Sequence, residues 1–174
     1  RRETYFGRLP ELCGELRALA RCPIVLGGSG FSIFPEQLME FTGADFGIHG
    51  EGETAFAGLV TALETGRDHS TIPGLVFRDG ERIVVNRRVA RREVPENGSP
   101  ERPEALTSYY LRRSSMLNVQ TQRGCSHRCC YCTYPIIAGR AWRRREPEAV
   151  ADEFAVLERR GARYVFIVDS VFNS

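Results

Sequence analysis

The chain contains no lysine, because all 24 of its basic residues are arginine. A Schiff base formed through a lysine amine is therefore excluded on this chain. No apolar run approaches the roughly 20 residues that a membrane-spanning helix needs, and there is no signal-peptide pattern. The formal net charge is only +2 over 174 residues, so the overall charge gives no reason to expect a nucleic-acid partner.

The composition is that of a globular protein, with 42% hydrophobic and 26% charged residues. The six cysteines are distributed unevenly. Cys13 and Cys22 stand apart, whereas Cys125, Cys129, Cys130 and Cys132 fall in one short stretch. A disulfide framework would spread its cysteines over the fold, so this crowding favours a metal or cluster site in a reducing compartment. We therefore expect a cytoplasmic protein with buried thiols at Cys13 and Cys22.

Hydrophobic periodicity in the first half predicts strands that alternate with helices, and hence an α/β fold with a parallel sheet. The predicted helices are 11–21, 35–41 and 51–65, and the predicted strands are 24–26 and 45–48. Asp79-Gly80 then predicts a hairpin between 74–78 and 82–86. We expect this α/β domain to occupy residues 1–86.

Residues 87–114 are rich in Arg, Glu and Pro and predict an irregular linker. Beyond them, strands at 117–122 and 164–168 flank a helix at 147–160. This order predicts one right-handed βαβ unit within a second domain, 115–174. Functional residues are expected just beyond the strand ends, where open sheets and barrels place their sites.

The densest motif is Gly124-Cys125-Ser126-His127-Arg128-Cys129-Cys130-Tyr131-Cys132. Three of its thiols have the spacing C-x₃-C-x₂-C. Iron–sulfur clusters are held by cysteine thiolates, and three ligands on a four-iron cluster leave one iron open. An open coordination position distinguishes a reactive metal site from a structural one.

This motif, with an aromatic residue before its last cysteine, resembles the signature of radical S-adenosylmethionine (SAM) enzymes. The resemblance implies that Cys125, Cys129 and Cys132 bind a [4Fe-4S] cluster whose open iron chelates SAM. Reductive cleavage of the sulfonium would then release a 5′-deoxyadenosyl radical. Tyr131 would lie near the adenine. Asp169 and Ser170, at the end of the second strand, match the positions that contact the methionine amino group, although they differ from the commoner Gly-Gly-Glu form.

Two glycine-containing segments each follow a predicted strand, namely Gly27-Gly28-Ser29 and Gly50-Glu51-Gly52. Each alone is compatible with a tight turn between a strand and a helix. Placed before a radical motif, and followed by a hairpin, they resemble the cobalamin-binding domain of cobalamin-dependent radical SAM proteins. The resemblance implies that Gly27, Gly28 and Ser29 line the groove for the cobalamin nucleotide tail and that Gly50, Glu51 and Gly52 form the next loop.

The resemblance implies the C-terminal part of a Rossmann-like cobalamin-binding domain, followed by the first βαβ unit of a partial TIM-type barrel. We therefore expect a fragment that spans a domain junction of a longer protein. The implied activity is methyl transfer or rearrangement on an unknown small molecule, with an external one-electron reductant such as flavodoxin or ferredoxin. The sequence identifies no catalytic base.

Two alternatives stay open at this point. A methylthiotransferase-like radical enzyme would need further cluster cysteines in its N-terminal domain, which Cys13 and Cys22 alone do not supply. A non-enzymatic iron–sulfur or zinc module could use His127 with Cys125, Cys129 and Cys132.

Residues 109–145 contain eight arginines and no acidic residue. They could stabilise an anionic cluster and a substrate carboxylate, or form a solvated face that contacts RNA. For the run Arg143 to Arg145 the two interpretations are equally supported.

Overall fold

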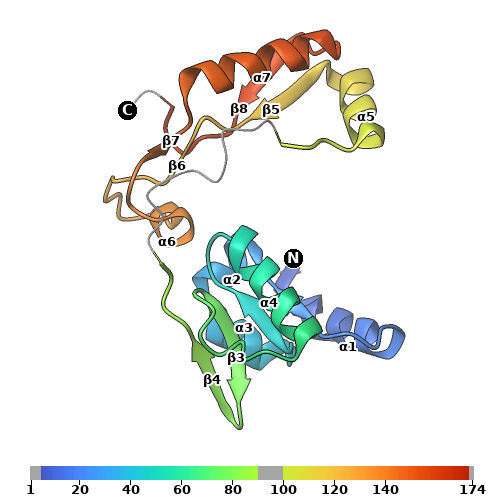
Figure 1. Cartoon of the computed structure of the whole chain (residues 1–174), viewed down its shortest axis with the longest axis vertical. Helices are drawn as coiled ribbons and strands as arrows, with labels where there is room; N and C mark the ends of the chain where they lie inside the picture. Colours follow the sequence, from blue (N-terminus) through green and yellow to red (C-terminus); the bar gives the residue numbers. More distant parts are fainter. Residues whose placement is uncertain (1–4, 90–99, 173–174) are drawn as a thin grey trace. The chain divides into compact units, whose positions relative to one another are not determined.

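The computed structural model describes residues 5–89 and 100–172, and the chain divides into two compact units, 1–90 and 91–174 (Figure 1). Both units mix helices with strands, as the sequence predicts. None of the helices in the described ranges has both the length and the apolar character that crossing a bilayer requires.

The first unit is built on a mixed four-stranded sheet in the order β1-β2-β3-β4. The β1 and β2 strands are parallel, whereas β2–β3 and β3–β4 are antiparallel. The expected parallel sheet is thus confirmed for β1 and β2 only, because the hairpin adds its two strands in the opposite sense. In chain order the elements are η1 (Tyr5–Arg8), α1 (Leu9–Leu19), β1 (Val25–Leu26), α2 (Gly28–Ile33), α3 (Pro35–Thr42), β2 (Phe46–Ile48), α4 (Glu53–Thr65), β3 (Leu75–Asp79) and β4 (Arg82–Val85).

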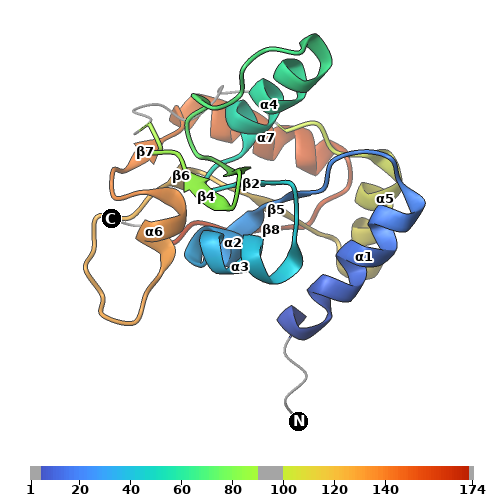
Figure 2. The same cartoon turned by 90° about the horizontal axis from the view of Figure 1, so that it is seen from below.

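Helices cover both faces of this sheet. Successive side chains of a strand point to opposite faces, and β3 divides accordingly. Val76 packs with Phe31 and Met39 of α2 and α3, whereas Leu75 and Phe77 pack with residues of α4 such as Leu59. Figure 2 shows α4 on one side of β2 and β4 and the α2–α3 pair on the other. Two buried apolar layers therefore hold the strand ends in place.

The second unit contains the predicted βαβ arrangement. Strands β5 (Met116–Val119) and β8 (Tyr164–Ile167) are parallel neighbours, and α7 (Pro147–Arg159) lies between them in sequence. The buried side chains of Leu117, Val119 and Leu157 form the core of this unit. A short antiparallel ribbon joins β6 (Gln122–Arg123) to β7 (Arg143–Arg144), and α6 (Tyr134–Ala138) lies between its strands in sequence.

The prediction of an irregular linker over 87–114 is wrong for its last part, because Glu104–Ser114 forms helix α5. Its first turn carries Glu104 and its last turn Arg112 and Arg113, charges that complement the helix dipole. Leu111 packs against the core of the second unit. The helix shows little apolar periodicity because few of its side chains face that core. Residues 90–99 of the expected linker lie outside the described residues.

Three further elements differ from the expectations. Helix α2 begins at Gly28, within the segment expected to be a turn, and the short helix α6 lies between the cysteine motif and the predicted helix, where the sequence predicts none. The strand expected at 117–122 divides into β5 and β6, because Gln120 and Thr121 leave the β5–β8 ladder. The strand end is therefore bent just before the cysteines.

The sequence predicts that the two isolated cysteines are both buried. This is confirmed for Cys13 and wrong for Cys22, which is exposed.

Candidate functional site

The loop that carries the cysteines is closed at its base. Cys125 donates its backbone N–H to the carbonyl oxygen of Gly139 at 3.1 Å. Gly124 has φ +85°, which favours glycine, and a Cβ there would overlap the carbonyl oxygen of Ala141. The chain thus enters and leaves the loop at one point. The residues between Cys125 and Gly139 therefore form a single protrusion from the β6–β7 ribbon.

Two side chains link the start of this loop to the residue just before β7. The indole Nε1 of Trp142 donates a hydrogen bond to Ser126 Oγ at 2.8 Å. The ring of His127 meets the ring of Trp142 edge-on, with centroids 6.0 Å apart. His127, considered as a zinc ligand in the sequence, packs on an aromatic ring here. No role for Trp142 could be predicted from the sequence, because its contact with Ser126 forms only when β6 and β7 pair.

The three predicted cluster ligands differ in exposure. Cys125 is buried, with 6% of its surface exposed, whereas Cys129 and Cys132 are exposed. A turn brings the last two together, since the N–H of Cys132 donates to the carbonyl oxygen of Cys129 at 3.2 Å. Across the described ranges, no three Cys, His, Asp or Glu side chains are gathered as a set that could hold a metal ion. Three thiols on one closed loop nevertheless make a donor set that suits an iron–sulfur cluster, and ligand loops often reach their final geometry only with metal bound.

Asp169 lies two residues beyond β8 and binds the segment that leads from β5 into β6. Its Oδ1 accepts hydrogen bonds from the N–H groups of Thr121 and Gln122, at 2.8 and 3.2 Å. Its Oδ2 accepts a bond from the Thr121 hydroxyl. Ser170 donates its hydroxyl to the carbonyl oxygen of Gly124 at 3.0 Å. Both residues therefore hold the segment that leads into the cysteine loop.

The aromatic residue of the cysteine motif is largely exposed to solvent. Tyr131 lies between Cys130 and Cys132, and 86% of its surface is exposed. Its ring is thus available to stack on a ligand that sits beside the loop.

The arginine run before α7 is only partly a solvated face. Arg143 is buried and donates from Nη2 to the carbonyl oxygen of Ala138 at 2.8 Å, which helps to close the loop. Arg145 pairs with Glu153 on α7 at 2.6 Å. Arg144 is exposed and its Nε lies 3.3 Å from Gln122 Oε1. The interpretation of this run as a uniform RNA-binding face is therefore wrong for Arg143 and Arg145.

The first unit carries the second predicted site. Because β1 and β2 are parallel neighbours, the loops after them emerge at the same edge of the sheet. These loops, together with the first residues of α2, hold the six residues expected to line the cobalamin site, namely Gly27, Gly28, Ser29, Gly50, Glu51 and Gly52. A Cβ at Gly27 or Gly28 would meet no atom within 4 Å, so there is room for a ligand to approach this backbone.

A buried hydroxyl joins the two glycine loops. Ser32, 1% exposed, donates from Oγ to the carbonyl oxygen of Gly28 at 2.9 Å. The same Oγ accepts the N–H of Gly50, also at 2.9 Å. The first bond is the local i→i−4 type that serine hydroxyls often make in helices. Ser32 could not be recognised in the sequence, since its bond to Gly50 joins helix α2 to a loop 18 residues further along the chain.

His49 lies next to the second glycine loop. Its N–H donates to the carbonyl oxygen of Gly74 at 2.8 Å. Its side-chain Nδ1 is buried and has no hydrogen-bond partner within the described part of the chain. Partial burial, and then the positive charge of Arg88, lower the pKa of His49 below its usual value of 6.5. The imidazole is therefore held in its neutral form near pH 7.

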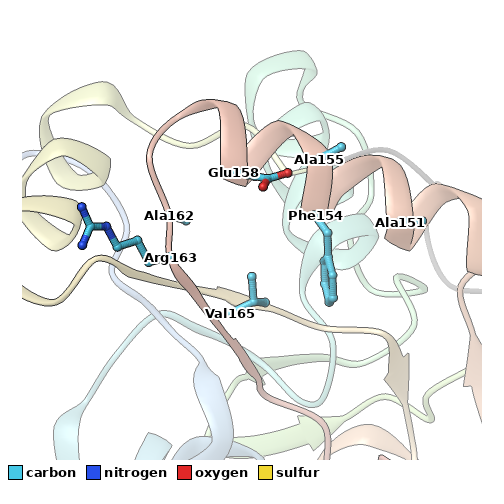
Figure 3. Close-up of a pocket in the computed structure, with 7 residues that line it drawn as sticks. All are labelled: Ala151, Phe154, Ala155, Glu158, Ala162, Arg163 and Val165. Atoms are coloured by element: carbon cyan, nitrogen blue, oxygen red, sulfur yellow. The ribbon is translucent and has the colours of Figure 1, made fainter.

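A groove lies elsewhere in the second unit, between α7 and β8. Figure 3 shows Phe154 and Val165 approaching each other across it, with Glu158 higher on the helix and Arg163 extending away. None of its seven lining residues is among the predicted site residues. The candidate site thus consists of loop segments rather than of this groove.

Comparison with known proteins finds relatives that match nearly the whole chain. No known family model matches the chain. Tryptophan 2-C-methyltransferase of Streptomyces laurentii is 28% identical over 210 residues, covering 91% of this chain and 35% of that protein. The radical S-adenosylmethionine methyltransferase TsrM from Kitasatospora setae, solved with cobalamin and a [4Fe-4S] cluster bound, is 30% identical and superposes with a TM-score of 0.79.

The superposition with TsrM covers 97% of this chain and 34% of that one. The fold is also shared with OxsB, a cobalamin-dependent S-adenosylmethionine radical enzyme, at a TM-score of 0.76 and 20% identity over 96% of this chain and 24% of that one. The chain therefore spans about a third or less of the length of these relatives. Its glycine loops, its cysteine motif and this likeness agree, and the chain belongs to the cobalamin-binding-domain-containing radical S-adenosylmethionine proteins.

Proposed function

We propose that this chain is the cofactor-binding part of a cobalamin-dependent radical SAM methyltransferase that acts on a small molecule. The observation that carries the proposal is the likeness to TsrM over 97% of the chain, which includes both the cysteine loop and the glycine loops. Two of its relatives, tryptophan 2-C-methyltransferase and TsrM, are methyltransferases. The substrate of this protein is not specified by the residues described.

In this proposal Cys125, Cys129 and Cys132 hold a [4Fe-4S] cluster. Three thiolates leave one iron for SAM, and a bound cluster of this kind supplies the electron that cleaves the sulfonium. The chain's own contribution is to present the thiols on a loop closed at Gly124 and Ala141. Cys130 has no ligand role, because its spacing to the other cysteines fits no cluster pattern.

The SAM contacts are proposed for Tyr131, Asp169 and Ser170. Tyr131 is exposed beside the thiols and offers a ring face for the adenine. Asp169 already accepts hydrogen bonds from Thr121 and Gln122. We therefore assign it first to fixing the end of β5, with its remaining acceptor capacity available to the methionine amino group. Ser170 similarly fixes Gly124.

Cobalamin is proposed to bind at the glycine loops of the first unit. Gly27, Gly28 and Ser29 leave room along the backbone for the nucleotide tail, and Gly50, Glu51 and Gly52 form the neighbouring wall. Bound cobalamin supplies a carrier for the methyl group. The chain's part is to hold the two loops at a fixed separation, and the Ser32 hydroxyl does this directly.

The test is cluster loading with matched cysteine variants. Anaerobic reconstitution should give about four iron and four sulfide per chain, the content of one [4Fe-4S] cluster. Changing Cys125, Cys129 or Cys132 singly to Ala should reduce this content strongly, whereas Cys130→Ala should load like the wild type. Preferred binding of a single zinc ion, or equal loading of all four variants, would contradict the assignment. An external one-electron reductant such as flavodoxin or ferredoxin should be required for turnover.

A further inference from the structure

A carboxylate that has no role in the proposed function is buried within the second unit. Glu153 lies in the middle of α7, and only 1% of its surface is exposed. It stands one turn before the core residue Leu157. Burial of a carboxylate without partners is strongly unfavourable. The partners of Glu153 therefore explain how a charged residue is tolerated at this position.

Two arginines bind the Glu153 carboxylate from different parts of the chain. Arg102 Nη2 lies 2.8 Å from Oε1, and Arg145 Nη1 lies 2.6 Å from Oε2. The side chains of Arg102 and Arg145 are themselves only 16% and 7% exposed. One acidic group therefore organises two buried guanidinium groups.

Both guanidinium groups also bind the C-terminal end of β5. Arg102 donates to the carbonyl oxygen of Asn118 at 2.6 Å and to its side-chain Oδ1 at 3.2 Å. Arg145 donates from Nη1 to the carbonyl oxygen of Gln120 at 2.9 Å, and its backbone N–H donates to the carbonyl oxygen of Thr121 at 2.9 Å. Glu153 thus fixes, through two arginines, the segment that leads to the cysteine loop.

This network is not arranged for stability alone. One carboxylate faces two guanidinium groups, and the Nε of Arg102 and the Nε and Nη2 of Arg145 are buried without a partner among the residues described. Apolar side chains of similar volume commonly replace buried ion pairs without loss of stability. What they cannot reproduce is the set of side-chain hydrogen bonds to Asn118 and Gln120, at and just beyond the end of β5, on the way to the thiols.

We propose that Glu153 is a positioning residue for the cysteine loop, acting through Arg102 and Arg145 on the end of β5. The proposal rests on the function proposed above, because the loop is taken to hold the cluster and SAM. Asp169 holds the same strand end from the side of β8, at Thr121 and Gln122. The path into the loop is therefore fixed from both sides.

The test compares an apolar replacement with the wild type. The triple variant Arg102→Met, Arg145→Met and Glu153→Leu approximately keeps the volume of the network and removes its side-chain hydrogen bonds. If Glu153 positions the loop, this variant stays folded by circular dichroism. Its reduced cluster should then need about tenfold more SAM, or more, for the half-maximal change in its electron paramagnetic resonance (EPR) spectrum, since loss of groups that orient metal ligands commonly costs 10–100-fold. Asp152→Asn, an exposed change on the same helix, should match the wild type.

A folded triple variant with the SAM dependence of the wild type would overturn the proposal. Arg102→Gln provides a second test that leaves Glu153 paired with Arg145, and it is decisive if the triple variant does not fold. It too should need more SAM for the half-maximal change, and an unchanged value would overturn the proposal. If the wild type itself binds no cluster or does not respond to SAM, the proposed function fails, and that outcome is distinct from failure of the positioning role.

Discussion

The hydroxyl of Ser32 lies 2.9 Å from the backbone nitrogen of Gly50 and accepts its hydrogen bond. Ser32 belongs to the helix after the first parallel strand, and Gly50 to the loop after the second. The bond therefore sets the separation of the two glycine loops at one edge of the sheet. Because the hydroxyl also donates to Gly28, one buried atom contacts both walls of the proposed cobalamin site.

Removal of this hydroxyl should weaken cobalamin binding. Ser32→Ala leaves the partly buried N–H of Gly50 without its acceptor, a loss of about 1 kcal/mol, and removes the link between the two loops. We expect the dissociation constant for hydroxocobalamin to rise about tenfold or more, measured by titration of its visible absorption. Ser70→Ala, an exposed serine of the same unit, is the control and should not change it. An affinity equal to that of the wild type in Ser32→Ala would contradict the bridging role.

Closure of the cysteine loop should depend on Gly124 more than on Gly139. Both have φ near +85°, so alanine is strained at either position, at about 1–3 kcal/mol. Only at Gly124 would the added Cβ overlap the carbonyl oxygen of Ala141, whereas at Gly139 it would meet no atom within 4 Å. Gly124→Ala should therefore lower the melting temperature and the iron content more than Gly139→Ala. Equal losses in the two variants would show that the close approach at Ala141 is unimportant.

The fluorescence of Trp142 should report cluster binding, because Trp142 is the single tryptophan of the chain. Its indole bonds to Ser126, the residue after the first proposed ligand. An iron–sulfur cluster absorbs near-ultraviolet and visible light, so a cluster bound on this loop should quench the indole fluorescence by energy transfer. Reconstitution should quench the wild type and Cys130→Ala alike and should leave Cys129→Ala largely unquenched. Quenching of equal size in Cys129→Ala would count against that ligand.

The first unit should lose stability in mild acid through His49. Burial and the charge of Arg88 lower the pKa of His49 in the folded state below 6.5, so the unfolded state binds the proton more readily. Stability should therefore fall as the pH drops below about 6.5 and level off below the folded-state pKa. Urea titrations of the wild type and of His49→Gln at several pH values measure this. A pH dependence in His49→Gln identical to that of the wild type would assign the effect to other groups.

Much of the fold follows from local patterns in the sequence. The predicted helices at 35–41, 51–65 and 147–160 are confirmed by α3, α4 and α7, because each pairs an apolar face with a clear start or stop. The Asp79-Gly80 hairpin is confirmed, with Asp79 opposite Arg82. Helix α5 could not be recognised, since its only strong signals are the charges at its two ends.

The candidate site could be located in the sequence but not assembled from it. The cysteine spacing and the glycine loops identify the segments, because their chemistry is local. The groups that hold those segments come from distant positions. Trp142 lies beyond the cysteine loop, Ser32 lies in α2 and bonds to the loop after β2, and Asp169 follows β8. Their roles depend on long-range pairing, which residue types and spacing do not encode.

The most direct test of the account is the EPR spectrum of the reduced, anaerobically reconstituted protein with and without SAM. Three cysteine ligands leave one iron open, so addition of SAM should change the spectrum, and Cys130→Ala should show the same change. A spectrum that SAM leaves unaltered, or a protein that takes up a single zinc ion in place of iron and sulfide, would contradict the central claim.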